Sequence, residues 1–347
     1  MKQTDKLRFI SFFLIFAFLA SFLPRRLRTC DENRNTPKGS EFQSETQDLD
    51  AVFIGSSYVY SFWEPPLAWE DAGIAVFSYT SSAMPAAAMQ YIMADCIKTQ
   101  PEALYILEVK TFLNTPTASD LHYLFDYMPA STNRMLAKHA CARYADLTLG
   151  EEIELYVPLF LFHSNWELVY DNRDAEAWGL KGAGNYPMFW ESTPMTDGLH
   201  AESTGLTEKQ FDALSSLLDY CDETGVRVLF TATPSYITDD MYFDQLDQIG
   251  EKITERGYTF LNFAEGDMPE QIGIDPEEDY YNAGHTNIGG AVKFTDYFTD
   301  YLVETYQFTD KRGMEGWENW DASVEQYKAV IEEYVPQRWA APPLPHS

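Results

Sequence analysis

Short, continuous apolar segments alternate with segments of helical periodicity along most of this chain. The segments of strand length that are rich in valine, isoleucine, phenylalanine or tyrosine are residues 51–55, 75–79, 103–109, 226–233 and 258–263. The segments with helical spacing of leucine, isoleucine and methionine are residues 86–99, 208–224 and 239–256. Fully apolar strands that alternate with helices are typical of a parallel sheet covered on both faces. The pattern therefore predicts an α/β fold with a parallel sheet between two layers of helices.

One connection between predicted strands, from residue 109 to residue 226, is far too long for a simple crossover. We expect an insertion at about residues 111–205, after the third strand. Loops at the carboxyl ends of parallel strands form the binding sites of open α/β sheets, so this insertion could cap the site. Its aromatic residues suit either contact with sugar rings or ordinary packing. The glycine-rich stretch at residues 179–184 predicts a mobile segment within it.

An apolar run at residues 9–23 lies between basic side chains near the N-terminus. It is shorter than the roughly 20 residues of a full membrane span, but snorkelling by Arg8 and Arg25 would close the gap. A cleaved signal peptide is the first alternative, although no small-x-small cleavage site follows the run, and a buried core helix is the second. We expect residues 1–30 to form a signal anchor. The basic residues on its two sides are balanced and do not set its orientation, but export of the main domain to the extracellular side is the usual outcome.

The remaining organisation follows from polarity and from helix-ending residues. Residues 31–48 are polar without an apolar period and are expected to be a linker. The main domain is expected at residues 49–308, and residues 309–347 are expected to hold a helix, at 323–334, and a tail. With 347 residues, 45% of them hydrophobic, the chain is large enough for one α/β domain with an insertion.

The charge of the chain is strongly negative and unevenly distributed. Six of the 24 basic residues but one of the 54 acidic residues lie before residue 30, so the rest holds 18 basic and 53 acidic residues, a net charge of −35. So acidic a body should repel nucleic acid, and we expect neutral or cationic ligands. The four cysteines and six histidines show no metal-ligand spacing, and no glycine-rich phosphate loop is present. We therefore predict no metal and no cofactor.

The first predicted strand runs into a turn of small residues that ends on Ser57. Such a turn exposes a serine at the carboxyl edge of the sheet, where backbone amides of the following helical turn can stabilise an oxyanion. A serine becomes a nucleophile only when a base can take its proton. The alternative interpretation is a serine-rich turn that merely caps a helix.

His285 follows the last predicted strand and precedes a helix-like stretch at residues 289–301. A loop at this place returns to the strand ends, where Ser57 is expected. We therefore predict a Ser57–His285 dyad, in which the histidine accepts the proton of the serine hydroxyl. The alternative is a histidine at a helix N-terminus without a catalytic partner.

The segments around Ser57 and His285 resemble the first and last sequence blocks of the SGNH/GDSL hydrolase superfamily, in the branch of membrane-anchored SGNH-like proteins of Gram-positive bacteria. They are more distantly similar to the D-alanyl transfer protein of teichoic-acid modification. The resemblance covers about residues 48–305. It implies a three-layer flavodoxin-like fold with esterase, deacetylase or acyltransferase activity outside the cell, with Ser57 as nucleophile and His285 as the histidine of the last block.

Three positions depart from the pattern of that family. The aspartate three residues before the histidine is replaced by Asn282, which can orient the imidazole but cannot stabilise an imidazolium by charge; the nearby Asp279 is the alternative. No glycine follows the second strand near Ser82, and no asparagine follows the third strand, where the chain reads Glu108-Val109-Lys110-Thr111. Ser82 and Asn165 are therefore the candidate oxyanion donors.

Together these features predict an exported serine esterase or acyltransferase of SGNH type that acts on O-acyl groups of cell-surface polysaccharide. Ser57 would form the acyl-enzyme, His285 would relay the proton, and Asn282 would orient His285. Water as acceptor would make the protein an esterase, and a sugar hydroxyl would make it a transferase. Because Asn282 departs from the family, a second hypothesis stays open: an SGNH-like protein that binds glycan or a cell-wall partner without turnover.

Overall fold

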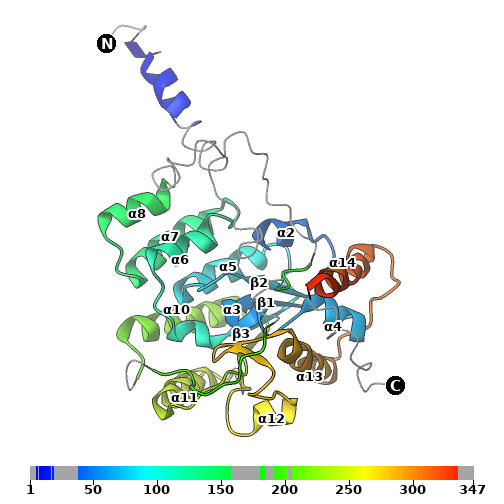
Figure 1. Cartoon of the computed structure of the whole chain (residues 1–347). Helices are drawn as coiled ribbons and strands as arrows, with labels where there is room; N and C mark the ends of the chain where they lie inside the picture. The colour runs from blue at the N-terminus through cyan, green and yellow to red at the C-terminus, as the bar shows by residue number, and fades with distance from the viewer. Residues whose placement is uncertain are drawn as a thin grey trace.

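The computed structural model describes residues 5–6, 8–16, 18, 38–157, 180–184, 191–201 and 205–334. Its centre is a five-stranded sheet in which all neighbouring strands are parallel. The strands are β1 (Ala51–Gly55), β2 (Val76–Thr80), β3 (Leu104–Glu108), β4 (Val228–Ala232) and β5 (Thr259–Asn262). They are arranged in the order β2-β1-β3-β4-β5 (Figure 1), which is the flavodoxin-like order. The predicted α/β fold with a parallel sheet is confirmed.

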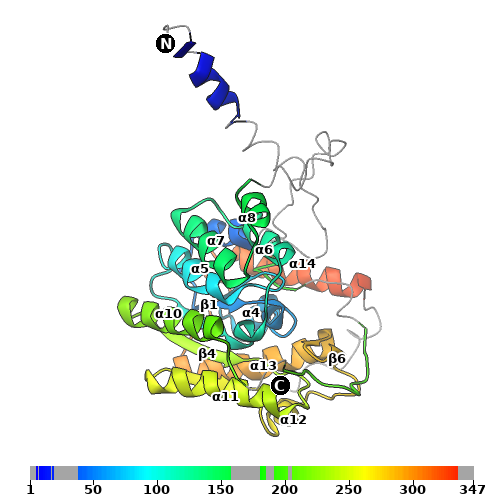
Figure 2. The same cartoon turned by 90° about the vertical axis from the view of Figure 1, so that its left-hand side faces the viewer.

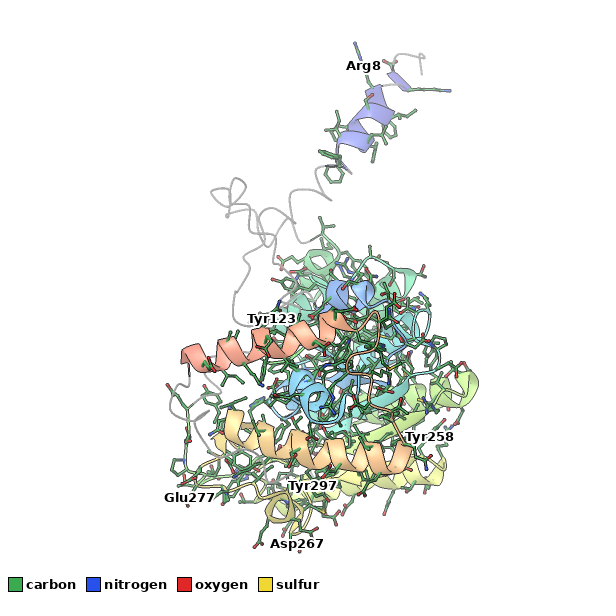
Figure 3. The ribbon with its side chains drawn as sticks, turned by 90° about the vertical axis from the view of Figure 1, so that its right-hand side faces the viewer. Arg8, Tyr123, Tyr258, Asp267, Glu277 and Tyr297 are labelled. Carbon is green, nitrogen blue, oxygen red and sulfur yellow. The ribbon has the colours of Figure 1, made fainter. Side chains whose placement is uncertain are left out.

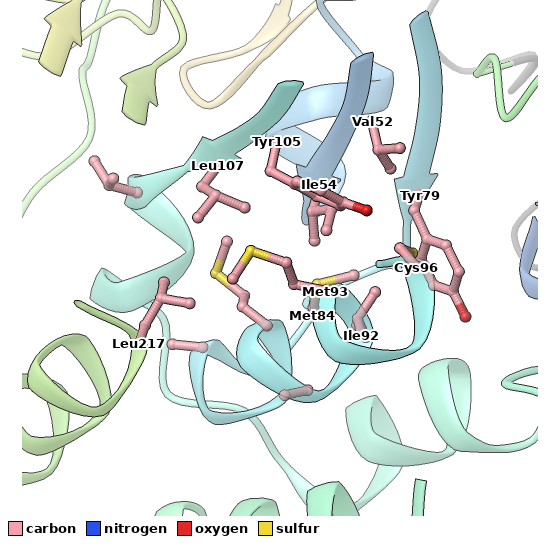
Figure 4. Close-up of a cluster of buried hydrophobic side chains, with 14 of the residues drawn as sticks. Val52, Ile54, Tyr79, Met84, Ile92, Met93, Cys96, Tyr105, Leu107 and Leu217 are labelled. Carbon is pink, nitrogen blue, oxygen red and sulfur yellow. The ribbon is translucent and has the colours of Figure 1, made fainter. Parts of the chain in front are cut away.

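Helices cover both faces of the sheet. One face carries α5 (Met89–Cys96), α10 (Glu208–Thr224) and α11 (Asp240–Glu255), and the other carries α4 (Pro65–Ala72) and α13 (Ile288–Tyr306). Successive strand residues point to opposite faces. Val52 and Ile54 therefore pack in the apolar core on the side of α5, α10 and α11 (Figure 4). Phe53 packs in the core on the opposite side, with α13. Every residue of β1, β2 and β3 is buried, so these strands carry apolar residues on both faces rather than at every second position.

The connection between β3 and β4 contains the predicted long insertion. Its described helices are η2 (Val109–Leu113), α6 (Ala118–Phe125), α7 (Thr132–Tyr144) and α8 (Leu149–Tyr156), before the crossover helix α10. Helices α6, α7 and α8 pack against one another at one end of the domain (Figure 2). Asn165, which lies between α8 and α10, is outside the described residues.

The predicted linker at residues 31–48 is corrected in its second half. Residues 38–44 form helix α2 (Lys38–Ser44), which packs on the edge strand β2. The ring of Phe42 is buried, with its centroid 5.2 Å from that of Phe77 and 5.7 Å from that of Tyr79. Lys38 is also buried and donates a hydrogen bond to Thr80 Oγ1. A single aromatic residue among polar ones gives no apolar period, so the sequence pattern missed this helix.

The glycine-rich stretch was predicted to be mobile, but its described part, residues 180–184, is fixed against β2. The backbone amide of Ser78 donates to the carbonyl of Lys181 at 3.0 Å. The Lys181 ammonium lies 2.6 Å from the carboxylate of Glu45, and both groups are buried. Gly182 has φ +82°, and a Cβ atom there would lie 1.9 Å from the Ser78 carbonyl oxygen. This glycine is therefore required for close approach to the strand.

The predicted C-terminal helix begins earlier than expected and belongs to the body of the domain. Helix α14 (Glu318–Tyr334) packs against α4, as α13 does from the other side (Figure 3). The indole of Trp320 donates to Glu45 at 3.1 Å, and the indole of Trp69 in α4 donates to Asp321 at 2.8 Å. Glu45 therefore contacts both Trp320 of α14 and Lys181 in residues 180–184.

The predicted signal anchor lies only partly within the described residues. Residues 8–16 are helical, and residues 19–23 of the apolar run are outside the described part. Among the helices that the structure describes, none is both long enough and apolar enough to cross a membrane. The anchor remains a prediction from the sequence.

Candidate functional site

The turn after β1 places Ser57 at the carboxyl edge of the sheet. Ser56 is the N-cap of the short helix α3 (Ser57–Tyr60), and its hydroxyl accepts a hydrogen bond from the amide of Tyr58. Ser57 is the first helical residue, so its own N–H has no partner within the helix. Gly55 makes the tight turn possible, because a Cβ atom there would lie 2.5 Å from Val59 Cγ2 and 2.7 Å from Glu108 Cβ. Ser57 is half-buried.

His285 is carried by a small antiparallel hairpin of β6 (Tyr280–Asn282) and β7 (His285–Thr286). The carbonyl of Ala283, in the two-residue turn, accepts a hydrogen bond from the amide of Tyr236 at 2.8 Å. Asn287 follows β7 as the N-cap of α13, and its Oδ1 accepts from the amides at positions 289 and 290. The hairpin is therefore fixed between the loop after β4 and the start of α13.

These two segments bring Ser57 and His285 into hydrogen-bond contact. The Oγ atom of Ser57 lies 2.7 Å from Nε2 of His285. On the other side of the ring, Nδ1 of His285 lies 2.8 Å from Oδ1 of Asn282. The three side chains are thus connected by two consecutive hydrogen bonds, from serine to imidazole and from imidazole to amide. This is the geometry that a general base needs to accept a serine proton.

The hydrogen-bond pattern also identifies which nitrogen of His285 carries the proton. The backbone N–H of Gly284 points at the same side-chain atom of Asn282, at 3.0 Å, so that atom is the amide oxygen. An oxygen only accepts, so Nδ1 of His285 must donate to it. In the neutral ring the lone pair of Nε2 then faces the hydroxyl of Ser57. The tautomer is the one required for general base catalysis.

The ring of His285 is also held by packing. Tyr58 stacks on it, with ring centroids 5.5 Å apart and planes 13° apart. The carbonyl of Tyr58 accepts a hydrogen bond from Thr233 Oγ1 at 3.0 Å, which ties α3 to the end of β4. Thr286 donates to the carbonyl of Ser61, which ties the hairpin to the end of α3. The serine turn and the histidine hairpin are therefore cross-connected on several sides.

The surroundings of His285 favour its neutral form. Burial of the ring and, second, the positive charge of Lys110 lower the pKa of His285 to about 4. At neutral pH the ring is therefore unprotonated and able to accept a proton. The partner at Nδ1 is a neutral amide rather than a carboxylate, so it offers less stabilisation to the imidazolium that proton transfer would create.

Asp279, the alternative to Asn282, has a different role. Its carboxylate accepts from the ammonium of Lys293 at 2.5 Å and from the amide of Asp275 at 2.7 Å. Its backbone carbonyl accepts from the amide of Asn287 at 2.8 Å. Asp279 is buried at the base of the hairpin and fixes it to α13, whereas Asn282 makes the contact with His285.

The turn after β2, which contains the candidate oxyanion donor Ser82, lies beside the end of β1. The amide of Ser81 donates to the carbonyl of Gly55 at 3.4 Å, and the hydroxyl of Ser82 lies 2.9 Å from that of Tyr60 in α3. The next residue, Ala83, has φ +44°. The turn thus contains a left-handed residue, the backbone conformation that glycine favours, although no glycine is present. If Tyr60 donates in this contact, the hydroxyl of Ser82 keeps its own proton for an oxyanion.

The end of β3 and the start of η2 contribute two buried charged residues that the sequence did not identify as part of the site. Glu108 and Lys110 are both fully buried, and Lys110 Nζ lies 4.0 Å from Glu108 Oε1. The signal available in the sequence was a pair of charged residues at the end of an apolar strand. In the described part of the chain, no three His, Cys, Asp or Glu side chains are grouped as the ligands of a metal ion.

Comparison with known proteins adds no identification. No family model matches the chain, and no curated protein is significantly similar to it. The candidate site is therefore defined by the arrangement of Ser57, His285 and Asn282 at the carboxyl edge of a flavodoxin-like sheet.

Proposed function

We propose that this protein is an exported serine esterase or acyltransferase of SGNH type that acts on O-acyl groups of cell-surface polysaccharide. The observation that carries the proposal is the contact of 2.7 Å between Ser57 Oγ and His285 Nε2, with the opposite ring nitrogen held by Asn282. The sequence blocks around both residues, which resemble those of the SGNH superfamily, support the same assignment.

In the proposed reaction Ser57 Oγ attacks the acyl carbon while His285 Nε2 takes the hydroxyl proton. The tetrahedral intermediate collapses, the bond to the leaving alkoxide breaks, and the imidazolium returns the proton to that oxygen. The acyl group is then an ester of Ser57. Water or a sugar hydroxyl attacks this ester, gives its proton to His285, and Ser57 is released with its hydroxyl restored. The Ser57 amide, at the start of α3, is the first candidate to stabilise the oxyanion.

The substrate class follows from chemistry outside the dyad. The domain is strongly acidic, which disfavours anionic ligands, so a neutral or positively charged acyl ester fits better. A polysaccharide at the cell surface is the expected carrier if residues 1–30 anchor the chain in the membrane with its domain outside. The carboxyl edge of the sheet, where the dyad lies, is also where the long insertion begins after β3, and loops at this edge form substrate sites.

The second candidate function is binding of glycan or of a cell-wall partner without turnover. The observation that favours it is the neutral side chain at position 282 together with the lowered pKa of His285. A weakly basic imidazole without a carboxylate partner accepts a serine proton less readily. The two functions differ in whether Ser57 reacts.

Labelling with a fluorophosphonate, which reacts only with activated serines, separates the two functions. The full-length chain, purified in detergent, would be compared with Ser57→Ala and His285→Ala variants. Ser216→Ala and His122→Ala serve as matched controls, because Ser216 is exposed on α10 and His122 lies on α6. We expect the wild type and both controls to be labelled at Ser57 and the two site variants to remain unlabelled.

A folded wild type that resists labelling would contradict the enzymatic proposal and favour the binding function. Circular dichroism and thermal unfolding of every variant would show that loss of labelling is not loss of folding. If labelling occurs, hydrolysis and transfer of acetyl and other acyl groups on isolated cell-wall polysaccharide would identify the acceptor.

A further inference from the structure

We propose that the buried ion pair of Glu108 and Lys110 positions the serine turn and the histidine hairpin against each other and opposes protonation of His285. The inference rests on the proposed function, because it assigns a role within the Ser57–His285 site. Neither residue corresponds to a group expected from the sequence blocks. Glu108 is the last residue of β3, and Lys110 lies in η2, which follows directly. Strand β3 lies between β1, which leads into the serine turn, and β4, whose following loop contacts the hairpin.

Glu108 holds the serine side of the site. Its Oε2 accepts hydrogen bonds from the amide and the hydroxyl of Thr111, at 3.2 and 3.3 Å, and its Oε1 accepts from the amide of Thr233 at 3.3 Å. The hydroxyl of Thr111 in turn accepts from the amide of Ser56, directly before the nucleophile, at 3.3 Å. Burial raises the pKa of Glu108, and the charge of Lys110 and the hydrogen bonds that its carboxylate accepts act against this shift.

Lys110 holds the histidine side. Its ammonium donates to the carbonyl of Thr233 at 2.7 Å and to the hydroxyl of Ser235. That hydroxyl donates to the carbonyl of Gly284, the residue before His285, at 3.5 Å. The ammonium also lies 4.3 Å from the ring centroid of Tyr58, the ring that stacks on His285. A single lysine thus reaches both the hairpin and the aromatic support of the catalytic ring.

Stability alone gives little reason to bury this pair. Removing two charges from water is costly, and replacing a buried ion pair with apolar residues of similar volume is often neutral or stabilising. The partners of Glu108 and Lys110 are, however, the residues that fix Ser56, Tyr58 and Gly284. The pair therefore connects the two loops whose separation sets the distance between nucleophile and base.

The same pair also supplies the charge that acts on His285. The titratable groups that face it are Tyr58 of α3 and Tyr242 of α11, and burial raises the pKa of both, that of Tyr58 to about 12. Neither tyrosine is charged at neutral pH. Burial lowers the pKa of Lys110 to about 7, so the lysine is positive throughout the range in which His285 titrates. It therefore lowers the pKa of His285 beyond the effect of burial.

The test uses the full-length chain with selectively labelled histidine. Ring NMR signals are followed from pH 3.5 to 8, and His285→Ala identifies the signal of His285 among the six histidines. The variants are Lys110→Met, Lys110→Arg and the double variant Glu108→Gln/Lys110→Met, which leaves no unpaired charge if the single change unfolds the protein. Lys138→Met is the matched control, because Lys138 is also buried but lies on α7 and donates to the carbonyl of Leu155.

We expect Lys110→Met and the double variant to raise the pKa of His285 toward its ordinary value, and Lys110→Arg and Lys138→Met to leave it low. In the same variants the fluorophosphonate labelling rate at its pH plateau should fall about tenfold for Lys110→Met, because the loops lose their alignment. Lys110→Arg should retain more of it. An unchanged pKa of His285 in both Met-containing site variants would overturn the inference, even if Ser57 is labelled. A raised pKa in a protein whose Ser57 never reacts would uphold the electrostatic role and contradict the enzymatic function instead.

Discussion

The ring of Tyr58 lies face to face with the imidazole of His285, with centroids 5.5 Å apart. Tyr58 is the residue directly after the candidate nucleophile, so one short helix supplies both the serine and the surface on which its base rests. Gly284 keeps the hairpin close to this ring, since a Cβ atom there would lie 3.2 Å from Tyr58 Cε1. The geometry of the dyad therefore depends on packing as well as on hydrogen bonds.

Replacing Tyr58 with leucine should slow labelling of Ser57. Stacked aromatic pairs contribute about 0.5–1.5 kcal/mol beyond the area they bury, so we expect the rate to fall about twofold to tenfold. Tyr58→Phe keeps the stacked ring and should retain most of the wild-type rate. The second-order rate constant of fluorophosphonate labelling measures the effect. Equal rates for the leucine and phenylalanine variants would show that the stack does not hold the imidazole.

Asn282→Asp should make the site more reactive. A carboxylate at the position of the amide oxygen, 2.8 Å from His285 Nδ1, would raise the pKa of His285 and stabilise the imidazolium. We expect labelling at pH 7 to rise at least about tenfold, while Asn282→Ala lowers it. The same rate constants, measured across pH, test the prediction. A slower Asp variant with intact folding would mean that the amide is the better partner in this site.

Acidification should destabilise the folded protein through His285. Its pKa is about 4 when folded and about 6.5 when unfolded, so between these values the unfolded state binds more protons. The free energy of unfolding therefore falls as the pH falls from 6.5 toward 4. Urea unfolding at pH 7 and pH 5 should show a larger loss for the wild type than for His285→Gln, whose side chain does not titrate. Identical losses would place the folded pKa near its ordinary value.

Gly182→Ala should release the segment at residues 180–184 from β2. The added methyl group would collide with the Ser78 carbonyl, and φ +82° is strained for alanine. The amide of Ser78, which donates to Lys181, should then exchange its hydrogen faster. Hydrogen exchange read by mass spectrometry over residues 76–80 measures this, and Gly150→Ala on the exposed start of α8 is the control. Unchanged protection at Ser78 would contradict the fixed position of this segment.

The sheet could be predicted from the sequence because β1, β2 and β3 are buried on both faces. Such strands are continuous apolar runs, and β1 and α10 lie at the predicted residues, 51–55 and 208–224. Helix α2 could not be predicted in this way, because Phe42 is its only large apolar residue and its buried Glu41 accepts a hydrogen bond from the distant backbone amide of Lys181. The prediction of a mobile segment was wrong for residues 180–184, because Gly182 serves close packing against β2 rather than flexibility.

The proximity of Ser57 and His285 could also be expected, because the ends of a parallel sheet gather the loops that follow its strands. The residues that connect those loops could not be predicted from the sequence. Glu108 and Lys110 are charged side chains at a strand end, where solvent exposure is the common outcome, and their burial depends on partners 125 residues away such as Thr233 and Ser235. Spacing along the chain does not reveal such pairings.

Direct detection of an acyl group on Ser57 is the most decisive measurement. The full-length protein would be mixed with an activated acetyl ester, quenched in acid after seconds, digested and examined by mass spectrometry. We predict an acetyl group on the peptide that contains Ser57, absent from the His285→Ala variant. A folded wild type in which this peptide stays unmodified, or in which other serines are acetylated equally in both proteins, would contradict nucleophilic catalysis by Ser57.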